Sequence, residues 1–185
     1  QGVVWGSSDA LKKTEGQGHY FNEEKSRYRL NPSGPQHAQI GALAGITQYF
    51  DNLYRHHFGD SDIGIHQKAV KVFDLVEAHE ANLANQLLDY LKNRDDIRIL
   101  GQDHATPGKR ASTIAFHARG MPSQHIAQKL AEHQIAAGAG DFYALRCVES
   151  LGMDPEDGVV RVSLVQYNTT EEVEKLVQTL DSILP

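Results

Sequence analysis

The stretch GVVRVSLVQYNTTEEVEKLV, residues 158–177, constrains the fold of this chain more than any other segment. Its first part alternates apolar residues with a period of two, at Val160, Val162 and Leu164, which is typical of a β-strand that buries one face. Thr169 and Glu172 then form the capping-box pattern that begins a helix. The helix itself repeats apolar residues at spacings of three and four, at Val173, Leu176, Val177, Leu180, Ile183 and Leu184. A strand followed by an amphipathic helix predicts helices packed on a sheet.

The rest of the chain predicts further elements of both kinds. Periodicity and turn residues indicate strands at 97–100 and 111–118 and helices at 37–58, 65–93, 122–135 and 141–152. Residues 1–6 resemble a buried strand, residues 7–13 offer one short helical turn with Ser or Asp as its cap, and residues 14–36 are mostly loop. The fold class expected is therefore α+β, with helices covering one face of a small sheet in the second half. The first 60 residues are predicted to be an appendage with a stray strand, a loop and a linking helix.

Two of these helices have stripes that can be checked residue by residue. The long helix at 65–93 places Ala69, Phe73, Val76, Leu83, Leu87 and Leu91 on one side. Glu80 interrupts that stripe and must lie near its edge, because an isolated buried carboxylate is costly. In the helix at 122–135, Ile126, Ala127 and Leu130 are expected to point inward.

Composition excludes several classes of function. The 185 residues carry a net charge of -6 and no block of Lys or Arg, which argues against a nucleic-acid partner. No uncharged apolar window of about 18 residues exists, so no membrane partner is expected, and no signal-peptide pattern is visible. The single cysteine, Cys147, cannot form an internal disulfide, which fits a reducing compartment and predicts a cytoplasmic protein.

Arg161 is the unusual residue of the strand at 158–165. Alternation places it on the face opposite Val160 and Val162, two residues from Ser163. A guanidinium buried without a partner costs several kcal/mol, at least, so this face must meet a carboxylate, a wet cavity or open solvent. Arginine binds carboxylates through two parallel hydrogen bonds. From the residues alone, a solvent-exposed arginine remains the simpler alternative.

Other candidate sites are weak. Ten histidines invite a metal site, yet His125 and His133 have no third ligand at a suitable spacing, so no metal is expected. Ser112 and Ser163 lack a neighbouring base or nucleophile elbow, and Lys109 reads as a surface charge near a turn. The GAGD segment at 138–141 is too short for a phosphate-binding loop.

Several segments, in order, resemble one family. GVVRVSLVQYNTTEEVEKLVQTL is similar to the C-terminal strand and helix of class-V aminotransferases, the pyridoxal-phosphate (PLP) group that includes cysteine desulfurases. STIAFHARGMPSQHIAQKLAEHQIAAGAGDFYA resembles their small domain, and NPSGPQHAQIGALAGITQYFDNL resembles the segment that joins large and small domains. QGVVWG is similar to the strand after the cofactor-binding lysine. The resemblance covers almost the whole chain and is strongest toward the cysteine desulfurase-like branch.

The resemblance implies roles for three residues. Arg161 matches the arginine that binds the α-carboxylate of an amino-acid substrate. Ser33 stands where the joining segment contacts the phosphate of the partner subunit's cofactor, although a serine replaces the family's threonine. His37, close to it, is a candidate second contact, and a solvent-exposed histidine at the start of a helix is the simpler alternative. The resemblance also implies that residues 1–58 are a remnant of the large domain with the linking helix, and that residues 59–185 are the small domain. Because the family's Schiff-base lysine lies upstream of GVVWG, we expect no catalytic residue here and no PLP bound by this chain alone.

Two residues bear on desulfurase activity. The position of the nucleophilic cysteine in desulfurases is Tyr143 here, and Cys147 is expected to face the core of its helix. Persulfide chemistry needs an accessible thiolate, so desulfurase activity is not expected.

Two hypotheses for function follow. The first is the C-terminal part of a PLP-dependent enzyme that acts on amino acids, truncated and not catalytic by itself. The second is a non-catalytic carboxylate-binding or oligomerisation module derived from that family. Both predict an amino-acid or other carboxylate ligand at Arg161 and a homo-oligomer, because a linking helix and first strand shaped for a missing domain would expose apolar surface.

Overall fold

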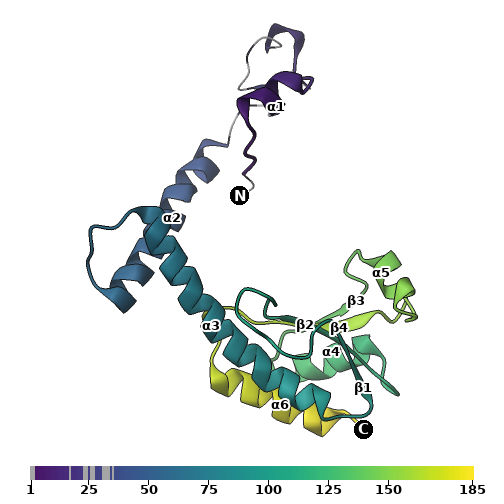
Figure 1. Cartoon of the computed structure of the whole chain (residues 1–185). Helices are drawn as coiled ribbons and strands as arrows, with labels where there is room; N and C mark the ends of the chain where they lie inside the picture. Colours follow the sequence, from purple (N-terminus) through teal and green to yellow (C-terminus); the bar gives the residue numbers. More distant parts are fainter. Residues whose placement is uncertain (1–2, 17, 23–24, 26–27, 31–33, 35) are drawn as a thin grey trace. The chain divides into compact units, whose positions relative to one another are not determined.

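The structure is a computed structural model that describes residues 3–16, 18–22, 25, 28–30, 34 and 36–185. The chain divides into two compact units, Gln1–Val72 and Phe73–Pro185, which are described separately below (Figure 1). The predicted partition into 1–58 and 59–185 concerns ancestry and stays a prediction. The elements are α1 (Ser8–Lys13), η1 (Tyr20–Asn22), α2 (His37–Phe58), α3 (Ile65–Lys92), β1 (Ile97–Leu100), β2 (Thr113–Ala118), α4 (Ser123–Glu132), β3 (Gly138–Gly140), α5 (Leu145–Ser150), β4 (Val159–Ser163) and α6 (Thr170–Ile183).

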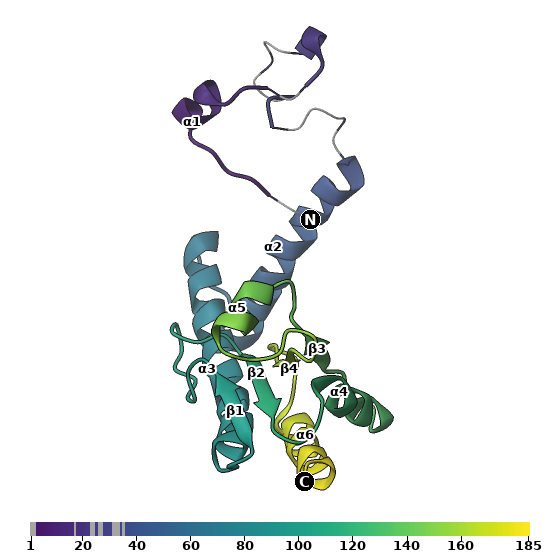
Figure 2. The ribbon, with the colours of Figure 1, turned by 90° about the vertical axis from the view of Figure 1, so that its right-hand side faces the viewer.

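The second unit contains a four-stranded antiparallel sheet in the order β1-β2-β4-β3. Figure 2 shows helices α3, α4 and α6 together along the sheet, and their apolar side chains share one core with it. On the sheet side of this core lie Ile114, Phe116, Val160 and Val162, at most 4% exposed. The predicted α+β fold, with helices on one face of the sheet, is therefore confirmed.

The core follows the predicted stripes for most of their length. Leu83, Leu87 and Leu91 of α3 are fully buried, as are Ile126 and Leu130 of α4. The α3 stripe fails at its start, where Phe73 is half exposed. Leu83 is the first residue of the predicted stripe whose side chain is fully buried. The reason is that the residues of α3 that pack in the core of the second unit begin at Ala81.

Glu80 of α3 is only partly buried, in keeping with its expected place at the edge of the stripe. One of its carboxylate oxygens lies 2.7 Å from the Ser112 hydroxyl, which lies 2.6 Å from the carbonyl of Leu164. Ser112 thus links α3 to both central strands, which is a structural role.

The predicted capping box at the start of α6 is confirmed. The Thr169 hydroxyl accepts a hydrogen bond from the Glu172 amide at 3.3 Å, and the Glu172 carboxylate accepts one from the Thr169 amide at 3.0 Å. The Asn168 side chain accepts from the Val165 amide at 2.9 Å and so closes the turn that leads out of β4. These bonds fix the path of the chain from β4 into α6, because they satisfy amides that a helix start leaves unpaired.

Two glycines let β3 approach the start of β4. Gly158 has φ +63°, and a Cβ there would lie 2.2 Å from the Gly140 carbonyl carbon. Gly140 itself has φ +127°. No other residue type fits this backbone contact without displacing β3.

The segment around α5 differs from prediction. The helix spans Leu145–Ser150 rather than 141–152, because Phe142 and Tyr143 adopt left-handed φ values of +52° and +62°. The predicted glycine stop is present, since Gly152 follows the helix with φ +71°. Cys147 is exposed, so the expectation that it faces the helix core was wrong. The helix is too short to bury more than Val148.

The first unit contains α1, α2 and the start of α3. The cap of α1 is Ser7, one of the two residue types expected there, and α2 has the predicted bounds. The predicted buried strand at 1–6 was wrong for its described part, since residues 3–6 have no strand structure and Val3, Val4 and Trp5 are 72–86% exposed. A strand needs a neighbour for its backbone hydrogen bonds, and the described residues of this unit contain no strand that could pair with residues 3–6.

No described helix is long and apolar enough to cross a membrane.

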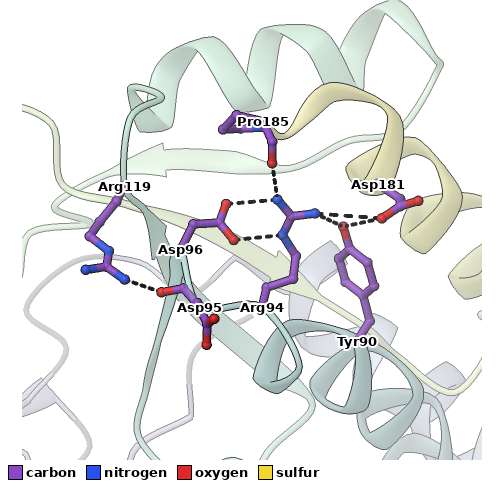
Figure 3. Close-up of polar contacts among 7 residues, drawn as sticks. All are labelled: Tyr90, Arg94, Asp95, Asp96, Arg119, Asp181 and Pro185. Atoms are coloured by element: carbon purple, nitrogen blue, oxygen red, sulfur yellow. Dashed lines mark hydrogen bonds and ion pairs between the residues drawn. The ribbon is translucent and has the colours of Figure 1, made fainter.

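An arginine joins three parts of the second unit (Figure 3). Arg94, just after α3, donates from Nε and Nη2 to the two carboxylate oxygens of Asp96, each at 2.9 Å. Nη2 also donates to the carbonyl of Pro185 at 2.5 Å, and Nη1 lies 3.7 Å from Asp181. The hydrogen bonds from Arg94 hold the pKa of Asp96 below its usual range. Because its donors bind the protein itself, Arg94 serves the fold and leaves no free edge for a ligand.

Candidate functional site

Arg161 lies on the face of β4 opposite the one that packs on α3, α4 and α6. Its strand neighbours are Ala115 on β2 and Gly138 on β3, both in direct register. Small residues on either side leave the long side chain room to lie across the sheet, and Arg161 is exposed. The predicted orientation away from the helices is therefore present in the structure.

The guanidinium of Arg161 stacks on an aromatic ring. Its Cζ atom lies 3.9 Å from the ring centroid of Phe142, in the loop between β3 and α5. A Cβ at Gly138 would lie 2.9 Å from two atoms of the same ring, so the ring sits directly against the β3 backbone. Among the described residues, Arg161 forms no ion pair and no side-chain hydrogen bond, so its N–H edge is open. An arginine that is stacked but not hydrogen-bonded can still bind a planar anion.

A groove of about 450 Å³ lies near the end of β4, and Arg161 does not line it. The groove runs between residues 134–136, the end of β4 and the start of α6. Its polar lining includes Ser163, Asn168 and Lys175. The register of β3 and β4 ends at the pair Gly138 and Arg161, so Ser163 pairs with Thr113 of β2 on one side and has no β3 partner on the other. Ser163 thus lines a groove, a feature that its sequence context did not indicate.

A second cavity, of about 390 Å³, lies over β1 and β2 and is basic. Arg98, His117 and Arg119 line it together with Asp154. His117 Nε2 lies 3.3 Å from a carboxylate oxygen of Asp157, whose other oxygen accepts from the Ser123 amide at 2.7 Å. Alternation along the two strands could have indicated this cluster, since Arg98 and His117 are paired in register. Among the described residues, no group of three His, Cys, Asp or Glu side chains could hold a metal ion.

Of the two residues predicted to contact a cofactor, the structure describes only His37. Ser33 lies outside the described residues. His37 is the exposed first residue of α2, and no side chain caps that helix. His37 belongs to the first unit and Arg161 to the second, so each is described in its own unit only.

Tyr143 and Cys147 are both accessible. Tyr143 projects fully from the loop beside Phe142, and its amide donates to the Asp141 carboxylate at 3.2 Å. Cys147 is exposed in the first turn of α5. Burial therefore gives no reason to exclude thiol chemistry at Cys147. The expectation that Tyr143 stands at the position of the desulfurase nucleophile comes from the resemblance and stays a prediction.

These features define a class: a helix-covered antiparallel sheet with an arginine on its open face. The comparison with protein families identifies that class, because residues 67–176, more than half of the chain, match the model for aminotransferase class-V. The chain belongs to the class-V aminotransferase family.

Particular relatives agree with this assignment. The chain is 29% identical over 185 residues to the aminotransferase-like protein FGM3 of Gibberella zeae. The aligned region covers 98% of this chain and 42% of the relative. It is 34% identical over 106 residues to a probable cysteine desulfurase of Pseudomonas putida, across 57% of this chain and 24% of the relative. Its fold matches the cysteine desulfurase CsdA of Escherichia coli with a TM-score of 0.61 and 24% identity, over 84% of this chain and 32% of that one. The chain therefore spans less than half the length of these relatives.

Enzymes of this family depend on PLP. A PLP enzyme needs a lysine for the Schiff base and an acidic partner for the pyridine nitrogen. Lys175 lines the groove at the end of β4 together with Glu172, and Lys109 lines a cavity beside α3 together with Glu77 and Glu80. Arg161 lines neither of these two cavities, so no chemical step is assigned to PLP in this chain.

Proposed function

We propose that this chain is the C-terminal, small-domain part of a PLP-dependent enzyme that transforms amino acids, and that Arg161 binds the α-carboxylate of the substrate. The observation that carries the proposal is the open N–H edge of the exposed Arg161, on the face of β4 opposite α3, α4 and α6. The strand sequence around it matches the family position for this role. A bidentate clamp would orient the substrate, and orientation can lower a barrier by several kcal/mol.

We infer that the chain does not catalyse by itself. Neither Lys175 nor Lys109 lines a described cavity together with Arg161, and the resemblance implies that Tyr143 stands in place of the desulfurase nucleophile. The test is to mix the protein with PLP and then add borohydride, which reduces an aldimine to a stable secondary amine. We expect no stoichiometric aldimine absorbance before reduction and no covalently bound pyridoxyl group after it. A stoichiometric pyridoxyl-lysine adduct would contradict the inference.

The carboxylate role is tested by thermal shift with L-alanine, pyruvate and L-alaninamide, which keeps the amino group of alanine but lacks the carboxylate. We expect the two carboxylates, but not the amide, to stabilise the wild-type protein. The variant Arg161→Ala should lose this response, whereas Arg98→Ala, a matched change on the same sheet face, should keep it. Equal responses of the wild type and Arg161→Ala would rule out the role.

The second candidate is a non-catalytic binding or oligomerisation module. Exposed apolar side chains favour it: Ile40 and Ile46 of α2 are about half exposed, and Trp5 is 86% exposed. Such side chains are often covered by a second copy. Light scattering at increasing concentration is the test, and a monomer at every concentration would contradict self-association.

A further inference from the structure

The loop between β3 and α5 is built so that Phe142 turns back onto the sheet. Phe142 and Tyr143 adopt consecutive left-handed conformations, which residues other than glycine adopt uncommonly. The Asp141 side chain accepts from the Tyr143 amide at 3.2 Å, and the Asp141 carbonyl accepts from the Ala144 amide at 2.9 Å. As a result the ring of Phe142 packs against the sheet while Tyr143 projects into solvent.

Three residues form a stack at this point. Gly138 lies directly opposite Arg161 in the β3–β4 register. The Phe142 ring occupies the space that any side chain at position 138 would fill, since a Cβ there would lie 2.9 Å from ring atoms. The guanidinium then lies 3.9 Å from the ring centroid, within the range of a cation–π contact.

We propose that Phe142 is a positioning residue for Arg161. Gly138 is required next to it, because any side chain at position 138 would clash with the Phe142 ring. This inference rests on the proposed carboxylate role of Arg161 and extends it. The ring covers one face of the guanidinium and restricts its rotamers, and it leaves the N–H edge free. A ligand must then approach in the plane of the guanidinium, which suits the two oxygens of a planar carboxylate. The ligand class is a small carboxylate bound edge-on, with Phe142 setting the angle.

Nuclear magnetic resonance of the Arg161 Nε–H group in the whole chain tests this proposal. The signal is assigned by its absence in Arg161→Lys. Ring currents of Phe142 should shift it away from the signals of unstacked arginines, and Phe142→Leu should return it to their range. Phe142→Tyr, which keeps a ring, should restore the shifted position, a rescue that a purely space-filling role would not show. Gly138→Ala, which displaces the ring without removing it, should resemble Phe142→Leu.

Sodium acetate is the binding probe in the same spectra. Loss of an exposed cation–π contact should weaken acetate binding at Arg161 by about threefold in Phe142→Leu and leave Phe142→Tyr near wild type. The proposal is overturned if Phe142→Leu, with the core methyl signals of Val160 unchanged, leaves the Arg161 signal where it was. A wild-type Arg161 that stays shifted but ignores acetate would instead refute the carboxylate role, while the positioning by Phe142 would stand.

Discussion

The bond between Arg94 and Asp96 should stabilise the second unit in a way that depends on pH. The substitution Asp96→Asn keeps one oxygen that can accept from Arg94 but removes the charge and the second acceptor. Both side chains are largely covered, at 18% and 26% exposed, so solvent screening is incomplete. A hydrogen bond to a charged group contributes about 1.5–3 kcal/mol, and with partial exposure we expect a loss of about 1–2 kcal/mol at neutral pH.

The sign of the pH dependence follows from the lowered pKa of Asp96. A carboxylate with a depressed folded-state pKa stabilises fully above its unfolded pKa, which is about 3.9. That stability is lost as the pH falls through the lower folded-state value. The difference between wild type and Asp96→Asn should therefore be constant near neutral pH and shrink in acid.

Urea unfolding followed by the methyl signals of Leu87 and Val160 reports on the second unit alone. The matched control is Asp89→Asn, which breaks an exposed pair with Lys92 at the end of the same helix. Exposed pairs of this kind contribute little, so the control should unfold like wild type. If Asp96→Asn also unfolds like wild type at neutral pH, or if its deficit persists unchanged in acid, the reasoning is refuted.

Three further changes test the packing of the second unit, each by urea unfolding. Leu87→Ala removes a fully buried side chain and should cost about 2–5 kcal/mol; a cost under about 1 kcal/mol would mean the site is not packed as described. Thr169→Ala should cost about 1 kcal/mol by removing the N-cap of α6, and no loss would disprove the capping box. Gly158→Ala should destabilise more than Gly120→Ala, because only position 158 meets backbone atoms; equal effects would argue against the close approach of β3.

The sequence predicted those features that depend on neighbours within a few residues. The alternation of Val160 and Val162, the capping box of α6 and the bounds of α2 all follow from local patterns. The open-face placement of Arg161 follows from the same alternation.

The features that sequence patterns missed depend on distant contacts. The stack of Phe142 on Arg161 joins residues of a loop and a strand, and it needs two left-handed residues that no propensity indicates. The bond from Arg94 to Pro185 spans nearly half of the chain. Residues 3–6 were predicted as a strand from their apolar character, but a strand forms only where a neighbour can pair with it. Cys147 was placed in a core because free cysteines are commonly buried, whereas α5 is too short to bury it.

The most direct test of the central claim is a titration of the Arg161 guanidinium with an amino acid. L-alanine should shift the Arg161 Nε–H signal with saturation, and L-alaninamide, which lacks the carboxylate, should not. The Arg98 signal, on the same face but already bonded to the Leu151 carbonyl, should stay in place. Absence of a saturable shift at Arg161, or an equal response at Arg98, would contradict the assignment of Arg161 as a carboxylate-binding residue.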